Sequence, residues 1–66
     1  MRILRLKEVT KKTGLARSTI YKYVDAGTFP KPIELGGRSV GWVDSEINDW
    51  ILGKIQERDM TKLDLK

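Results

Sequence analysis

Residues 13–27 read TGLARSTIYKYVDAG, which predicts the end of one helix, a tight turn and the whole of a second helix. Gly14 and Gly27 stand where a glycine commonly follows the last residue of a helix. The first helix is therefore expected over residues 6–13 and the second over residues 17–26. Helices this short do not persist alone in water, so both must be held by packing against the rest of the chain.

The second helix divides into an apolar and a polar face. Ile20 and Val24 are one turn apart and are expected to face inward, with Tyr23 beside them. Two short helices joined by a glycine-containing turn, the second with polar residues outward, are typical of a helix-turn-helix. A plain helical hairpin within a core gives the same pattern. The residues expected mainly on the outward side are Arg17, Ser18, Tyr21, Lys22 and Asp25.

A helix-turn-helix points to DNA as the ligand. An α-helix fits the major groove, and the preceding helix braces it against the DNA backbone. Tyr21 has two readings, since it can contact a phosphate or sugar or pack against the wing that the following hairpin would form. The side chains predicted to supply hydrogen-bond donors to phosphates and base edges are Arg17, Ser18, Thr19, Tyr21 and Lys22.

Residues 33–42 predict a β-hairpin, because apolar residues flank a glycine-rich centre. A four-residue loop would pair Leu35 with Val40 and Ile33 with Trp42, so that all four apolar side chains share one face. A two-residue Gly-Gly turn would instead bring an arginine to that face. We favour the longer loop, since one face of a small hairpin must be apolar to pack on helices.

The favoured loop, residues 36–39, places Arg38 at the tip with Ser39 beside it. Glycines allow the backbone to approach a phosphate, and an arginine can enter a narrow minor groove. This loop is therefore a candidate DNA-contacting wing, although an ordinary hairpin with an exposed arginine would look the same.

A third helix is expected after Asp44 or Ser45, both good N-terminal caps. Its apolar stripe consists of Ile47, Trp50, Ile51 and Ile55, and Gly53 weakens its second half. Trp42, Trp50 and Phe29 are expected in the core. Glu46 and Asp49 are read with Asp44 as a capping cluster and not as a metal site. We predict one domain over residues 1–59 and a flexible tail over residues 60–66.

Composition restricts the class of function. The 66 residues include no histidine and no cysteine, which excludes thiolate metal sites and catalytic triads that need either residue. No apolar run reaches membrane-span length and no export signal is visible, so a cytoplasmic, non-enzymatic binding protein without cofactor, metal or small-molecule substrate is expected. Residues 1–43 hold nine basic and three acidic residues, a net +6, whereas residues 44–66 carry −2. This asymmetry favours a polyanionic partner for the first part of the chain.

The ordered set of motifs resembles the AlpA family of phage and prophage regulatory proteins, which is similar to excisionases and MerR-type winged helices. The resemblance covers roughly residues 2–59. Ala16 departs from it, because the family usually has serine before the second helix. The motifs that carry the resemblance are LRLKEV (residues 4–9), TGL (13–15), RSTIY (17–21), GTFPKP (27–32), LGGRSVGW (35–42), SEI (45–47) and WI (50–51).

The resemblance implies a mostly α-helical winged helix-turn-helix with a two-stranded wing and a C-terminal helix. It assigns recognition positions to Arg17, Ser18, Thr19, Tyr21 and Lys22, and wing positions to Gly37, Arg38 and Ser39. It also implies a sequence-specific regulator of transcription, or an excisionase-like recombination directionality factor, bound to double-stranded DNA. Partners on DNA would be further copies on repeated sites or an integrase. The alternative kept open is a protein-binding adaptor or inhibitor of a recombinase or regulator.

Overall fold

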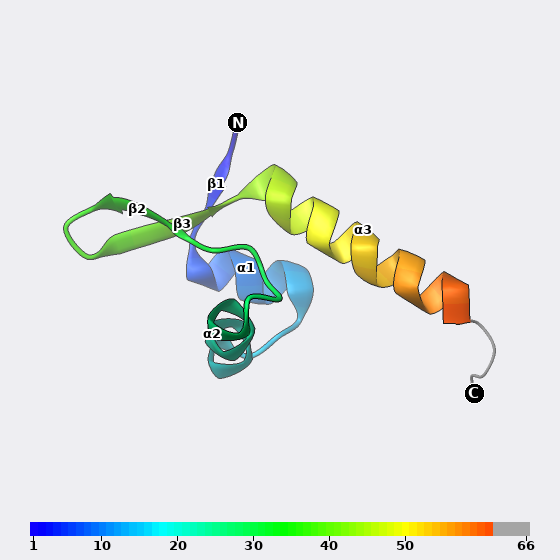
Figure 1. Cartoon of the computed structure of the whole chain (residues 1–66). Coiled ribbons are helices and arrows are strands. Elements are labelled where there is room, and N and C mark those ends of the chain that lie inside the picture. The colour runs from blue at the N-terminus through cyan, green and yellow to red at the C-terminus, as the bar shows by residue number, and fades with distance from the viewer. Residues whose placement is uncertain (62–66) are drawn as a thin grey trace.

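The protein is described by a computed structural model that covers residues 1–61, with three helices and a small antiparallel sheet (Figure 1). This is consistent with a winged helix-turn-helix, and the two helices of the predicted motif have the expected bounds. The elements are β1 Ile3–Leu4, α1 Leu6–Thr13, α2 Arg17–Ala26, β2 Ile33–Gly36, β3 Ser39–Val43 and α3 Asp44–Thr61.

Glycines end both short helices as expected. Gly14 and Gly27 have φ of 75° and 79°, a left-handed conformation that is costly for a residue with a Cβ. The amide of Gly14 donates to the carbonyl of Thr10 at 2.8 Å, which closes the last turn of α1. At the other end of α1, the Glu8 carboxylate accepts a hydrogen bond of 2.9 Å from the Arg5 amide, which is the glutamate half of a capping box.

The sheet has one strand more than the predicted hairpin. Its order is β1-β3-β2, with all neighbours antiparallel, and β1 pairs Ile3 with Val43 and Leu4 with Trp42. The Asp44 amide extends this ladder by donating to the Arg2 carbonyl at 2.9 Å. A strand of two residues is too short to show an alternating pattern, so it cannot be predicted from the sequence.

The predicted hairpin register is wrong. Ile33 lies opposite Gly41 and Glu34 lies opposite Val40, and a bulge follows before Gly36 meets Ser39. The turn between that last pair is Gly37-Arg38, which is shorter than the predicted four-residue loop. Because a one-residue change of register moves side chains to the other face, Ile33 and Leu35 do not share a face with Val40 and Trp42.

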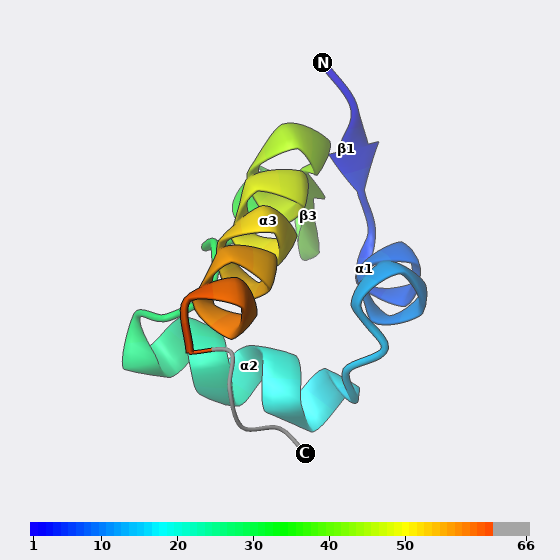
Figure 2. The ribbon, with the colours of Figure 1, turned by 90° about the vertical axis from the view of Figure 1, so that its right-hand side faces the viewer.

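The core lies where the sheet, α1, α2 and the start of α3 meet (Figure 2). Trp42 is fully buried, as expected, and its indole Nε1 donates to the Pro30 carbonyl at 2.9 Å. This bond gives the buried indole N–H a partner and fixes the segment between α2 and β2. The buried side chains are Leu4, Val9, Ile20, Phe29, Trp42 and Ile47.

An aromatic contact fixes α3 to the segment between α2 and β2. The rings of Phe29 and Trp50 are 4.8 Å apart between centroids, in an edge-to-face arrangement. The Trp50 Nε1 donates to the Thr28 carbonyl at 2.7 Å. Phe29 is buried, as expected, whereas Trp50 is only half-buried at the border of the core.

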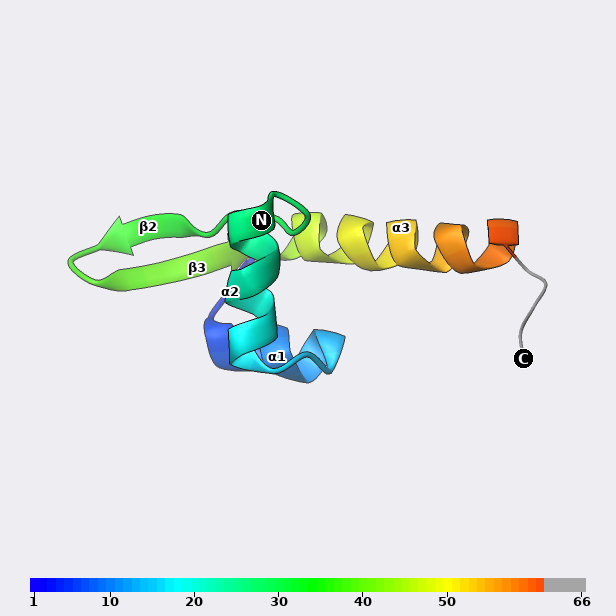
Figure 3. The same cartoon turned by 60° about the horizontal axis from the view of Figure 1, so that its bottom comes forward.

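Helix α3 starts at Asp44, directly after β3, and its second half extends away from the rest of the molecule (Figure 3). Its apolar stripe fades accordingly, since Ile47 is buried, Ile51 half-buried and Ile55 39% exposed. Met60 and Thr61 belong to the helix, not to the predicted tail. The remainder of that tail, residues 62–66, lies outside the described residues.

Replacing Gly53 with alanine should stabilise the protein. The position is inside α3, and a Cβ added there would meet no atom within 4 Å. Alanine is favoured over glycine by about 1 kcal/mol in a helix interior, so thermal denaturation followed by circular dichroism should show a rise of about 4–8 °C. Gly14→Ala is the control, because φ of 75° makes that substitution destabilising. A lower melting temperature for Gly53→Ala would show that Gly53 makes a close contact.

Candidate nucleic-acid interface

The outward face of α2 carries the predicted recognition residues. Arg17, Ser18 and Lys22 are exposed, Tyr21 is 41% exposed, and Thr19 is half-buried. The inward face holds Ile20, which is completely buried. The helix therefore presents polar donors on the side that does not pack, as a helix inserted into a groove must.

The start of α2 is open to solvent. Ala16 precedes the helix in an extended conformation and provides no side-chain hydrogen bond to the first amide groups. Uncapped amides at a helix N-terminus favour anions, since their N–H groups and the helix dipole both attract negative charge. Because Ala16 offers no side-chain oxygen to these amides, they can donate to an anion such as a phosphate oxygen.

The turn before α2 is held by hydrogen bonds of the Thr13 side chain. The Thr13 hydroxyl donates to the Val9 carbonyl at 2.8 Å and accepts from the Leu15 amide at 3.2 Å. Leu15 packs against the core. These contacts fix the angle between α1 and α2, which the sequence could only indicate through the glycine at position 14.

The hairpin turn lies at the end of the sheet most distant from the helices (Figure 1). Gly36 and Gly37 have φ of 123° and 55°, values that favour glycine at both positions. Arg38 is exposed in the turn, as predicted, and Ser39 is half-buried at the start of β3. The structure thus places the three predicted wing residues together at one end of the hairpin.

One aromatic contact joins α2 to the hairpin. The rings of Tyr21 and Trp42 are 6.3 Å apart between centroids and tilted by 58°. Of the two readings of Tyr21, packing against the hairpin is therefore observed, while its remaining exposed surface lies on the recognition face. The buried indole of Trp42 couples the position of α2 to that of β3.

Most basic side chains of the first 43 residues have no acidic partner within residues 1–61. Of the nine, only Arg2 and Lys12 form ion pairs there, with Glu8 and Asp44. Lys7 and Lys11 were not among the predicted site residues, yet they are exposed, unpaired and one turn apart on α1. Their i, i+4 spacing is visible in the sequence and indicates that the two lysines lie on one face of α1. The unpaired basic residues are Arg5, Lys7, Lys11, Arg17, Lys22, Lys31 and Arg38.

The ion pair between Lys12 and Asp44 fixes the end of α1 to the start of α3. The Lys12 ammonium donates to the Asp44 carboxylate at 2.8 Å. This hydrogen bond and the positive charges of Lys12 and Arg2 lower the pKa of Asp44 below its ordinary value. Lys12 therefore supports the fold, and its ammonium group, unlike that of Lys11, is already paired with a carboxylate.

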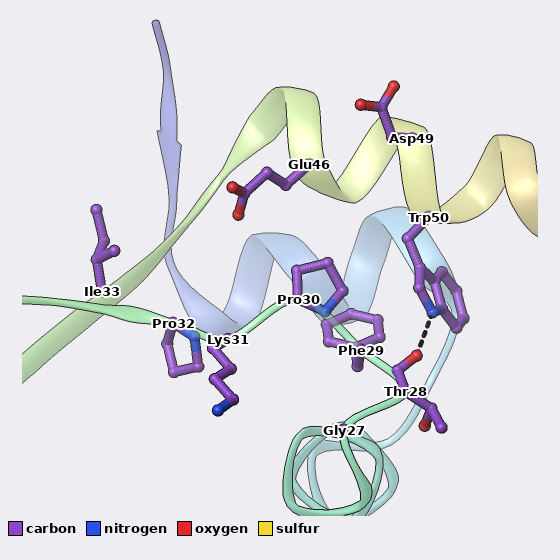
Figure 4. A pocket seen from close by; sticks show the side chains of 10 residues that line it. All are labelled: Gly27, Thr28, Phe29, Pro30, Lys31, Pro32, Ile33, Glu46, Asp49 and Trp50. Carbon is purple, nitrogen blue, oxygen red and sulfur yellow. Dashed lines mark hydrogen bonds between the residues drawn. The ribbon is translucent and has the colours of Figure 1, made fainter.

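A separate groove of about 680 Å³ lies between residues 27–33 and α3 (Figure 4). Phe29, Pro30 and Trp50 form its apolar wall, and Glu46 projects beside them. None of the predicted DNA-contacting residues lines it. Within residues 1–61, no group of three or more acidic side chains could hold a metal ion, and no helix is long and apolar enough to cross a bilayer.

Comparison with known proteins shows the family of this chain. Residues 2–55 match the family model of the prophage CP4-57 regulatory protein AlpA. The DNA-binding transcriptional activator AlpA of Escherichia coli K12 is 47% identical in an alignment of 57 residues that covers 77% of this chain and 81% of AlpA. The ORF88 protein of Enterobacteria phage P4 is 46% identical over 57 residues, 86% of this chain but only 65% of that protein. The chain belongs to the AlpA family of prophage regulatory proteins, which are regulators and not enzymes.

Proposed function

We propose that this chain is a DNA-binding transcription activator of a prophage, with α2 in the major groove and the hairpin turn on the backbone or in the minor groove. The observation that carries the proposal is the outward face of α2. Its Arg17 and Lys22 have no acidic partner in residues 1–61, and Tyr21 fixes the helix to the hairpin. The likeness to E. coli AlpA supports activation as the outcome of binding.

The proposed binding mode depends mainly on phosphates. A domain of this size reads few base pairs, so charge-assisted contacts from the unpaired basic residues must provide much of the affinity. The amides at the start of α2 would add a phosphate contact without a side chain. Arg17 and Lys22 would carry the sequence preference, because their side chains project from the helix that enters the groove.

Selection of bound sequences from a random DNA pool tests the proposal directly. A common motif among the recovered duplexes, and activation of a reporter placed beside that motif, would support it. Recovery of unrelated sequences would contradict sequence-specific binding. An excision role is the finer alternative within the same family resemblance. It predicts that the recovered motif lies within an integrase attachment site and that the chain changes the direction of recombination in a purified assay.

Replacing Arg38 with alanine should weaken DNA binding by about 1–2 kcal/mol while leaving the melting temperature almost unchanged. The side chain is exposed in the hairpin turn and has no ion pair within residues 1–61. Its loss removes one charge-assisted contact without disturbing the core. Affinity is measured by fluorescence anisotropy on one duplex recovered from the selection.

Arg58→Ala is the matched control for Arg38→Ala, since it removes the same charge near the far end of α3. Lys22→Ala should also weaken binding, but it should alter the preferred sequence as well. The wing substitution should weaken most sites together, unless the turn enters an A·T-rich minor groove. Equal effects of Arg38→Ala and Arg58→Ala would contradict the assignment of the hairpin as a DNA-contacting wing.

A protein-binding adaptor is the second candidate function, favoured by the groove beside α3. Glu46 and Asp49 border it and have no partner within residues 1–61, so it would accept a basic segment of another protein. Glu46→Gln with Asp49→Asn should then abolish activation of the reporter and leave DNA affinity intact. Loss of DNA affinity in this double variant would argue against an adaptor role for the groove.

A further inference from the structure

The outer face of the sheet carries apolar side chains that the rest of residues 1–61 covers only in part. Strand pairing places Ile3 with Val43 and Ile33 with Gly41, on the face opposite Leu4 and Trp42. Ile33 and Leu35 are 41% and 44% exposed. Antiparallel sheets that pack on one side commonly carry polar residues on the other, and this face departs from that pattern.

Gly41 lies between side chains of the two neighbouring strands. A Cβ at this position would clash with the Ile3 Cγ2 atom and lie 3.1 Å from the Leu35 Cδ1 atom. Side chains of β1 and β2 therefore approach the glycine of the central strand from both sides. We call the apolar residues at these outward positions the outer sheet face, which consists of Ile3, Ile33, Leu35, Gly41 and Val43.

The outer sheet face is directed away from the candidate DNA interface. Trp42, on the opposite face of β3, contacts Tyr21 of α2. A chain bound to DNA through α2 would leave the outer sheet face accessible. Exposed apolar surface of this kind marks an interaction site more often than exposed apolar residues that stand singly.

We propose that two copies of this chain pack their outer sheet faces against each other when they are bound side by side on DNA, an inference that rests on the proposed function. The face has no charged side chain at its outward strand positions, so its partner must be uncharged there too. A second copy satisfies this requirement, because the same face repeated about a two-fold axis is complementary in character to itself.

The small size of the outer sheet face explains why the association of two copies requires DNA. Four partly exposed aliphatic side chains offer much less than the roughly 800 Å² per partner of a stable protein interface. Free chains should therefore associate only weakly. Two adjacent DNA sites raise the effective concentration of one copy near the other to the millimolar range, which allows a weak contact to act. A small domain that reads few base pairs gains site specificity in this way.

The test on DNA compares two pairs of substitutions with matched exposure. Ile33→Thr with Leu35→Thr changes the outer sheet face, and Leu52→Thr with Ile55→Thr changes residues of α3 that are 51% and 39% exposed. Binding is measured on a duplex with one selected site and on duplexes with two inverted sites at several spacings. The unchanged protein should bind the second site about tenfold more tightly than the first at one spacing.

The outer-face variant should lose that tenfold gain and keep its affinity for the single site, whereas the α3 variant should keep both. Melting curves confirm that each variant is folded. The inference is overturned if the unchanged protein shows no cooperativity at any spacing, or if the outer-face variant retains it. Absence of binding to the single site by the unchanged protein contradicts the proposed function instead.

A measurement without DNA further distinguishes failure of the proposed contact between copies from failure of the proposed function. Methyl NMR spectra of the free protein are recorded up to about 1 mM. Shifts that grow with concentration should be confined to Ile3, Ile33, Leu35 and Val43. Unchanged methyl shifts over this range, or shifts centred on Leu52 and Ile55, would overturn the proposed contact whatever the result with DNA.

Discussion

Raising the salt concentration from about 50 to about 200 mM should weaken binding of this chain to a selected duplex by about 250- to 1000-fold. This corresponds to a slope of log K against log salt of about −4 to −5, expected if about five phosphates are neutralised. Seven basic side chains of residues 1–43 have no acidic partner within residues 1–61, which is enough for that number of contacts. Anisotropy titrations at four salt concentrations give the slope.

The same titrations identify which charges are responsible. Arg38→Ala should make the slope shallower by about 1, because one phosphate contact is lost, and Arg58→Ala should leave it unchanged. A slope for the unchanged protein shallower than about −1 would show that the unpaired basic residues do not form the binding surface. The affinity would then have to come from uncharged contacts, and a DNA interface this small does not offer enough of them.

Replacing Trp42 with alanine should unfold the domain at room temperature. The side chain is fully buried, contacts Tyr21 and donates to the Pro30 carbonyl. Loss of a buried tryptophan costs about 3–5 kcal/mol, which is comparable to the whole stability of a domain of this size. The far-ultraviolet spectrum should lose most of its helical signal, and amide NMR resonances should collapse to the range of unfolded chains.

Two further variants remove less than the whole buried indole. Trp42→Phe keeps an aromatic ring but loses the indole N–H and part of the buried volume, so it should remain folded with reduced stability in urea. Trp50→Ala removes a half-buried indole at the border of the core and should destabilise less than Trp42→Ala. Cooperative urea unfolding of Trp42→Ala with a loss below about 1 kcal/mol would contradict the central role of this side chain.

The helix-turn-helix could be predicted from sequence because its signals are local. Gly14 and Gly27 end their helices in the left-handed conformation, and the spacing of Ile20 and Val24 identifies the buried face of α2. The family resemblance gave the fold class, which the structure supports. The assignment of Arg17, Lys22 and the other site residues to DNA contact stays a prediction, since exposure alone does not identify a ligand.

The hairpin register could not be predicted, because it depends on neighbours that are distant along the chain. A choice of register by the number of apolar residues on one face assumes that the other face is polar. The bulge at Leu35 and the pairing of β1 with β3 give a different answer. Ile3 covers Gly41 from the outside, so the apolar residues divide between two faces.

The sequence alone predicts the two short helices, their ends, the position of Arg38 in a turn and the burial of Trp42 and Phe29. These follow from backbone preferences and helical periodicity, which act over a few residues. The third strand, the hairpin register and the outer sheet face depend on tertiary packing. A strand of two residues has no period of its own, and a bulge of one residue reverses which side chains face the core, so both are decided by packing between segments far apart in sequence.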